Sequence, residues 1–396
     1  PMLRSLVGSE MCIRDRFDSG EHPVGVIKND ERVRLREGSA VLRISDSEAT
    51  SITEKRSTAI DDPSEDTRMI LNMGPSHPST HGVLRLILEL QGETVERSKP
   101  VIGYLHTGME KTGEELAYFQ GPTNTTRMDY LSPLFNELVF SLTTEKLLDI
   151  EVPERAKAIR ILMTELNRIS SHLVALATGG MDIGALSMMI FGFRERELIL
   201  NFFEKTSGLR MNHNYIRPGG VAADLPDNWQ KDIKEILKII PEKLKDYDEM
   251  LLDNPIWQGR LKNVGILTTE ECFAYGITGP SLRASGFSWD LRKTQPYSGI
   301  ENYEFEVPLL TDSDVFSRWR IKVLEIFESL KIVEQVMDTI PKGAYRIQDK
   351  KVTPPPRQRL DESMEALIHH FKILSLIHIS RCRRYSLCRS RWSPYH

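Results

Sequence analysis

The sequence predicts an α+β protein in which a small N-terminal antiparallel β unit precedes a mainly α-helical bundle core. Short alternating apolar runs predict the β unit at residues 67–105. Longer runs with a helical period of apolar residues predict the core at residues 106–373. An apolar fraction of 40% in 396 residues is sufficient for a large core. The net charge of −4 gives no basic face, so nucleic acid is not an expected partner.

The β unit is predicted from three short runs around residues 69, 83 and 99. The second run alternates, with leucines on one face and Arg85 and Glu89 on the other. The leucines are Leu84, Leu86, Leu88 and Leu90. Residues 17–66 are charged and weakly patterned, so we expect an extension or linker there.

Five helices are predicted after the β unit. Ser132 is a good N-cap with Pro133 in the first helical position, and Gly208 is a typical residue just past a helix end. The predicted ranges are 133–148, 154–177, 186–207, 228–252 and 312–340. A region of loops and short strands is expected at about 255–310.

Residues 174–193 could form a membrane-spanning helix by length and composition. They are long enough to span a bilayer and contain one charged residue, Asp182. Three glycines interrupt the segment, and an unpaired aspartate in lipid costs several kcal/mol. The glycines are Gly179, Gly180 and Gly184. A buried turn between two core helices is therefore favoured over a membrane span.

The two ends differ from the rest of the chain. Residues 1–16 and 374–396 show no periodicity and resemble translated adaptor DNA, so we expect both to be non-native and the chain to be truncated at its C-terminus. A genuine basic tail that binds a membrane or nucleic acid is the alternative. Of the four cysteines only Cys272 lies between these ends. One thiol builds neither a disulfide framework nor a cysteine-rich metal site, which favours a reducing compartment.

Two clusters are candidates for chemistry. His77 and His81 are four residues apart, but prolines and glycines around them make a helix improbable. A rigid loop that holds an imidazole against a ligand is one interpretation. Histidines that only satisfy local backbone groups are the other. Tyr130 lies just before the Ser132 cap, so one interpretation is a functional phenol at a helix N-terminus. The other is an ordinary half-buried tyrosine next to a cap.

Two further features lie in the helical region. Glu165, Arg168 and His172 have spacings that align them on one stripe, and a solvated face is the usual meaning of such a stripe. Asp182 stands alone in apolar sequence, so a buried carboxylate is expected there, which is a candidate for a tuned pKa or for a hydrogen-bond partner. The common phosphate-binding, serine-hydrolase and zinc-protease motifs are absent from the sequence.

Ten ordered motifs between about Met69 and Lys372 resemble the 49-kDa (D-type) subunit of respiratory complex I, an NADH:quinone oxidoreductase. They are NMGPSHPSTHGVLRL, GYLHTGMEK, RMDYLSP, ELNRISSHL, FRERE, NYIRPGGV, TGPSLRASG, PYSGIENYEF, TPPPRQ and ESMEALIHHFK. This family is related to the large subunit of nickel–iron hydrogenases, so the resemblance implies a hydrogenase-like fold. Thr107 departs from relatives that have arginine after the GYLH histidine.

The resemblance implies a site for quinone as the substrate. His81 and Tyr130 match the family's donors to the two quinone oxygens, both suitable residue types for proton transfer. Asp182 matches the acid that hydrogen-bonds this histidine. Arg85 and His172 match residues that face the terminal iron–sulfur cluster of an adjacent subunit, where they would raise its potential.

The resemblance also implies what this chain lacks. Hydrogenases bind their metals through cysteine pairs, and here Asp129 and Ser132 stand at the first pair. We therefore expect no metal and no cofactor bound by this chain alone. A metal-bearing hydrogenase or ion-pumping large subunit is the alternative that needs four cysteines. A structural module without catalysis would make His81 or Tyr130 dispensable.

The implied setting is a multisubunit complex. Other subunits would oxidise NADH and carry the clusters, and membrane subunits would continue proton translocation. The expected partners are the small iron–sulfur subunit and the membrane subunit at the quinone entrance. The expected location is peripheral, on the cytoplasmic side of the bacterial inner membrane.

Overall fold

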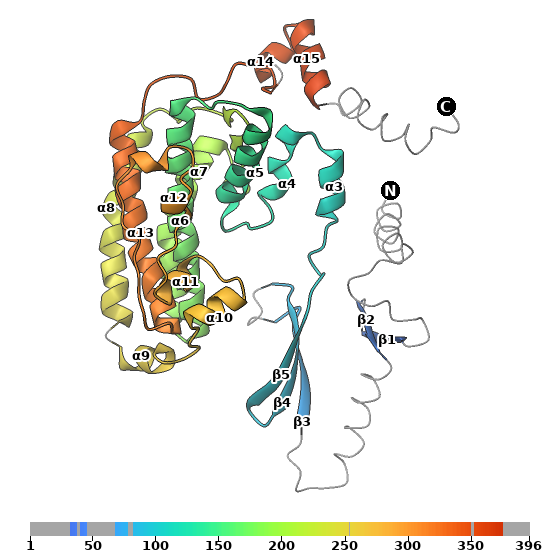
Figure 1. The fold of residues 1–396 in the computed structure, drawn as a ribbon, viewed down its shortest axis with the longest axis vertical. Helices are drawn as coiled ribbons and strands as arrows, with labels where there is room; N and C mark the ends of the chain where they lie inside the picture. The colour runs from blue at the N-terminus through green and yellow to red at the C-terminus, as the bar shows by residue number, and fades with distance from the viewer. Residues whose placement is uncertain are drawn as a thin grey trace. The chain divides into compact units, whose positions relative to one another are not determined.

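The computed structural model describes residues 32–37, 40–45, 68–77, 82–252, 254–349 and 352–374. The chain divides into two compact units between Glu110 and Lys111. Figure 1 labels the elements of both units.

The first unit contains the predicted antiparallel sheet. Strands β3 (Arg68–Met73), β4 (Arg85–Gln91) and β5 (Thr94–Val101) pair in the order β3-β4-β5. A second antiparallel pair, β1 (Arg32–Glu37) with β2 (Ala40–Ser45), lies within residues 17–66, where no strand was predicted. The three-stranded sheet confirms the small N-terminal β unit.

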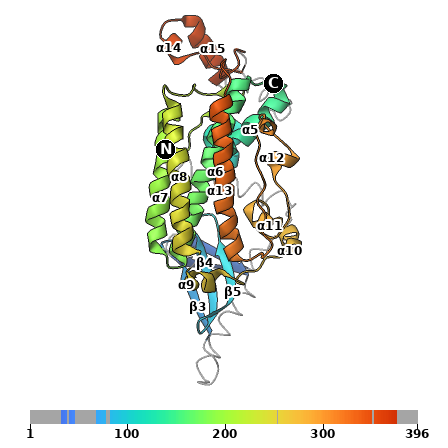
Figure 2. The ribbon, with the colours of Figure 1, turned by 90° about the vertical axis from the view of Figure 1, so that its left-hand side faces the viewer.

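The second unit is built on long helices whose buried apolar faces form one core. Helix α6 (Glu154–Asp182) contacts α7 (Leu186–Ser207) and α13 (Val315–Thr339), and α8 (Trp229–Leu251) contacts α7 and α13. Figure 2 shows these helices side by side. Helix α5 (Pro133–Leu148) packs on α6. The predicted helical bundle is confirmed, with α5 and α7 at their predicted ranges.

Short elements connect and extend these helices. They are α3 (Met109–Glu115), η3 (Tyr118–Gln120), α4 (Pro122–Thr125), β6 (Ile216–Arg217), β7 (Gly220–Val221), α9 (Pro255–Leu261), α10 (Thr269–Ala274), α11 (Pro280–Ala284), α12 (Leu291–Thr294), η4 (Ile300–Asn302), α14 (Arg357–Leu360) and α15 (Met364–Leu374). The prediction of short strands at 255–310 was wrong, since the elements assigned there are short helices. Local caps explain this difference: the side chain of Asn254 accepts from the backbone of Ile256, and Thr268 forms a capping box with Glu271.

Helix α6 runs past its predicted end at residue 177 to Asp182, and Gly180 within this extension serves packing. A Cβ on Gly180 would lie 2.7 Å from the Cβ of Met188, and one on Gly192 would lie 2.7 Å from the Cβ of Ala177. These glycines therefore let α6 and α7 approach closely. The predicted turn follows at residues 183–185, where Gly184 is exposed rather than buried. Within the described residues, every helix is too short or too polar to cross a bilayer.

Candidate functional site

The segment that carries Tyr130 is fixed to helix α6 through one buried amide. The Nδ2 of Asn167 donates to the carbonyl oxygen of Leu131 at 3.0 Å, and its Oδ1 accepts from the backbone N–H of Leu134 at 3.2 Å. Asn167 is buried, whereas the side chain of Tyr130 is 55% exposed. The backbone beside the phenol is thus held by the core while the phenol itself faces outward.

Ser132 occupies the predicted N-cap position of α5, but its side chain makes no cap hydrogen bond. Its hydroxyl lies 3.4 Å from the hydroxyl of Ser171, one turn beyond Asn167 on α6. The carboxylate of Asp129 accepts from the backbone N–H of Leu131 at 3.0 Å, which closes a local turn. Both residues at the positions expected for lost thiolates therefore shape the Tyr130 segment.

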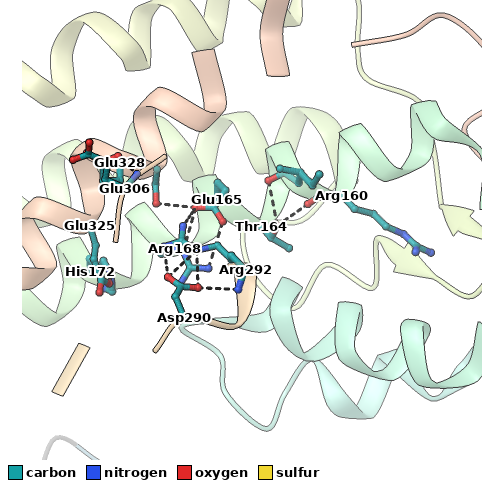
Figure 3. A network of polar contacts seen from close by, with 12 residues as sticks. Arg160, Thr164, Glu165, Arg168, His172, Asp290, Arg292, Glu306, Glu325 and Glu328 are labelled. Atoms are coloured by element: carbon teal, nitrogen blue, oxygen red, sulfur yellow. Dashed lines mark hydrogen bonds and ion pairs between the residues drawn. The ribbon is translucent and has the colours of Figure 1, made fainter. Parts of the chain in front are cut away.

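The stripe on α6 that was predicted to be a solvated face is largely buried, so that prediction was wrong. Glu165 is fully buried and accepts hydrogen bonds from Arg168 at 3.1 Å, Arg292 at 3.1 Å and Ser329 at 2.8 Å. Figure 3 shows this network. Two of these partners, Arg292 on α12 and Ser329 on α13, lie more than 120 residues away in sequence, and they cover the stripe.

Charges in this network compensate one another. Burial raises the pKa of a carboxyl, but Arg168 and Arg292 outweigh it, so the pKa of Glu165 is lowered. Asp290 contacts Arg292 at 2.7 Å, and although burial opposes ionisation this pair lowers the pKa of Asp290 to about 2. The guanidinium of Arg292 also lies 4.5 Å from the ring centroid of Phe305. Two acids and two arginines thus form a compact buried charge cluster.

His172 lies two turns along α6 from Glu165 and has a separate acidic partner. Its Nε2 is 2.7 Å from Oε2 of Glu325 on α13, and the other carboxylate oxygen accepts from Arg283 at 2.7 Å. Burial lowers the pKa of His172, and the hydrogen bond to Glu325 works against that decrease. Burial also opposes ionisation of Glu325, but His172 and Arg283 lower its pKa to about 2.

Arg85 is buried on β4, although the alternating pattern placed it on a polar face. Its Nη2 donates to Oδ1 of Asn72 on the neighbouring strand at 3.0 Å. His81 lies outside the described residues. His77 and Gly82, which lie on either side of residues 78–81, form an antiparallel bridge.

Asp182 is exposed, so the expectation of a buried carboxylate was wrong. It is the last residue of α6, where the helix reaches the surface before the turn to α7. Tyr130, His172 and Asp182 all belong to the helical unit. His172 and Asp182 are residues of α6, and the segment that carries Tyr130 is bound to α6 through Asn167. Arg85 belongs to the β unit.

Sequence reasoning did not identify Asn167, Glu325, Arg283, Asp290 or Arg292. A partial signal was present for Glu325, which interrupts the apolar pattern between Val323 and Ile326 on a core helix. Arg283 lies in the TGPSLRASG motif, yet its partner is 42 residues away. The contacts that define these residues depend on how α11, α12 and α13 pack on α6.

A metal site in a protein requires several ligating side chains close together. In the part of the chain that the structure describes, histidines, cysteines and acids form no group of three or more that could hold a metal ion. Cys272 is a buried free thiol on α10. This donor set does not fit a nickel–iron centre, which needs several soft thiolate ligands.

Comparisons with known proteins agree with one another. The family model described as "Respiratory-chain NADH dehydrogenase, 49 Kd subunit" matches residues 182–381. A D-type subunit of the NADH-quinone oxidoreductase of Salinispora arenicola is 53% identical over 332 residues, which cover 79% of this chain and 75% of that protein. The D-type subunit of Rhodococcus jostii is 55% identical over 326 residues, covering 78% and 74%. That of Nocardia farcinica is 50% identical over 356 residues, covering 85% and 78%.

Proposed function

Since the chain belongs to the family of 49-kDa (D-type) subunits of respiratory NADH:quinone oxidoreductase, we propose that it forms the pocket in which this complex reduces quinone. The observation that carries the proposal is the Tyr130 segment, whose backbone is anchored to α6 while its phenol is exposed. A reactive group that meets a mobile lipid-soluble substrate needs this combination of a fixed position and open access.

The chemistry assigned to the pocket is the uptake of two electrons and two protons by quinone, which yields quinol. Tyr130 donates a hydrogen bond to one quinone oxygen, and His81 donates to the other. Asp182, at the end of α6, either orients His81 by accepting its hydrogen bond as a carboxylate or, when it is itself protonated, returns a proton to His81. The electrons originate from NADH, which other subunits oxidise.

Arg85 and His172 are assigned to the side that faces the small iron–sulfur subunit. When that subunit is bound, electrons would reach the quinone one at a time from its terminal cluster. A cation or hydrogen-bond donor near the cluster favours the reduced form. Arg85 and His172 provide such groups, and each is already held by a hydrogen bond within this chain.

Membership of the complex also supports our proposals for the domains, the partner subunits and the location of the chain. The β unit at residues 67–105 carries the histidine loop, the helical core at 106–373 carries Tyr130, and the cavity descends from a hydrogenase-like large subunit. A membrane subunit lies at the quinone entrance, and proton translocation continues there. The chain is peripheral, on the cytoplasmic side of the inner membrane.

A photoreactive quinone tests the proposed pocket. The assembled complex is illuminated with an azidoquinone, and the labelled peptides of this subunit are mapped by mass spectrometry. We expect label on the peptide that contains Tyr130, and loss of that label when excess unmodified quinone competes. Competable label confined to other subunits, with this chain unlabelled, would contradict the proposal.

Asn167 offers a second test, because it holds the backbone at two residues that follow Tyr130, Leu131 and Leu134. Replacing Asn167 by alanine leaves the Leu131 carbonyl and the Leu134 N–H without their partner. We expect NADH:quinone activity to fall about tenfold, since small misplacements of reacting groups are costly. NADH:ferricyanide activity should be kept. Asn201→Ala, at an exposed position on α7, is the control and should leave both activities unchanged.

A further inference from the structure

We propose that Glu325, held in place by Arg283, is the positioning residue that fixes the ring of His172 and directs its proton uptake to Nδ1. This inference rests on the proposed role of His172 beside the partner's cluster. It assigns a function to two residues that the quinone site itself does not use.

The geometry gives each carboxylate oxygen one task. Oε2 of Glu325 lies 2.7 Å from Nε2 of His172, while Oε1 accepts from Nε of Arg283 at 2.7 Å and from its Nη2 at 2.5 Å. Arg283 is anchored in turn, because its Nη1 donates to the carbonyl oxygen of Trp289 at 3.0 Å. Glu325 is fully buried and Arg283 is nearly so. Three elements, α6, α11 and α13, therefore converge on one fixed pair.

This contact determines the tautomer of His172. An ionised carboxylate is only an acceptor, so Nε2 must carry the hydrogen that it shares with Glu325. The neutral ring then has its lone pair on Nδ1, and an added proton goes there. With Glu325 and Arg283 forming a neutral pair, the protonated His172 adds one positive charge, which compensates one electron on the neighbouring cluster.

The other charged groups that act on His172 oppose this proton. Arg168 on α6 and Lys322 on α13 both disfavour the charged ring, as burial does. Glu325 is the acid that acts in the other direction, through the hydrogen bond and through its charge. Its removal should therefore make protonation of His172 harder at any given pH.

The test is a redox titration of the partner's terminal cluster in the assembled complex. Electron paramagnetic resonance monitors the reduced cluster, and its midpoint potential is measured at pH values between about 6 and 8.5. In the wild type we expect the midpoint potential to fall with pH. In Glu325→Gln the pH range of this fall should move to lower pH by about one unit or more, as expected for loss of an adjacent opposite charge. Glu325→Gln combined with Arg283→Gln, which leaves no unpaired guanidinium, should move this range in the same direction but by less, because the Arg283 cation that disfavours a protonated ring is then also absent.

Two variants separate this inference from the function on which it rests. Glu328→Gln, one turn further along α13, lies outside the His172 contact and should titrate like the wild type. His172→Gln should make the potential independent of pH. A pH-independent His172→Gln with wild-type behaviour in both Glu325 variants would overturn the inference and leave the proposed function intact. Wild-type pH dependence in His172→Gln would overturn the assignment of His172 itself.

A measurement on the wild-type complex does not depend on any variant assembling. Infrared difference spectra on cluster reduction, with isotopically labelled histidine, report the tautomer of the responding ring. We expect bands of a neutral ring with hydrogen on Nε2 to be replaced by imidazolium bands. Bands of the Nδ1–H tautomer in the oxidised state would contradict the assigned contact.

Discussion

Replacing Tyr130 by phenylalanine is expected to lower NADH:quinone turnover by about a hundredfold or more and to leave NADH:ferricyanide activity unchanged. The change removes one hydroxyl and keeps the ring, on a segment whose backbone is held by Asn167. The loss should therefore reflect the missing donor and not a displaced loop. Ferricyanide accepts electrons upstream of the quinone pocket, so its reduction reports that the complex is assembled.

Two companion variants sharpen this result. Tyr275→Phe removes a hydroxyl from a tyrosine that is 76% exposed at the end of α10, and both activities should remain at wild-type level. His81→Ala should lose quinone activity as Tyr130→Phe does, because the two residues are assigned to the two quinone oxygens. Retention of full quinone activity in both Tyr130→Phe and His81→Ala would contradict the assignment of these two residues to the quinone site. It would favour a purely structural role for this subunit.

The helix ends that depend on local sequence signals were predicted correctly. Helix α5 begins at Pro133 and α7 ends at Ser207, as the Pro133 signal and the Gly208 terminator predicted. The end of α6 was predicted too early because glycine was interpreted as a helix breaker. Gly180 instead accommodates Met188, a residue of the next helix, and such a packing role depends on the tertiary structure.

The candidate site could be predicted only in part, for a related reason. Tyr130 and His172 were found through motifs, and both positions lie in one helical unit. The polar stripe of Glu165 and Arg168 has a spacing that fits a solvated face equally well. The stripe is buried by segments that are distant in the sequence. One of them carries Arg292, which lies 127 residues beyond Glu165. Asp182 shows the opposite error, since apolar neighbours in sequence did not make it buried.

The buried cluster around Glu165 predicts the largest effect on stability. Replacing Glu165 by glutamine should lower the free energy of unfolding by about 3–5 kcal/mol, the usual cost of breaking a buried ion pair from one side. Glutamine keeps the volume, so the loss comes from two arginines left without this counter-charge in a fully buried position. Chemical denaturation of the expressed chain, followed by circular dichroism, measures the difference.

The control for this change is Glu154→Gln on the same helix. Glu154 pairs with Lys157, but its side chain is 70% exposed, so this variant should differ from the wild type by less than about 1 kcal/mol. Glu165→Gln combined with Arg168→Gln should recover part of the lost stability, because it also removes one of the two cations that have lost the Glu165 carboxylate. Equal stability of Glu165→Gln and the wild type at neutral pH would show that the cluster does not stabilise the fold.

The pH dependence of the difference follows from the sign of the pKa change. Burial raises the pKa of Glu165, but Arg168 and Arg292 outweigh that effect, so the pKa is lowered from 4.5 in the folded chain. The unfolded chain therefore binds the proton more readily, and the contribution of the carboxylate is complete above pH 4.5. It is lost as the pH falls through the lower folded value, where Glu165 becomes neutral like the glutamine that replaces it. The two unfolding curves should thus differ at pH 7 and converge in acid, whereas a defect caused by shape alone would persist at every pH.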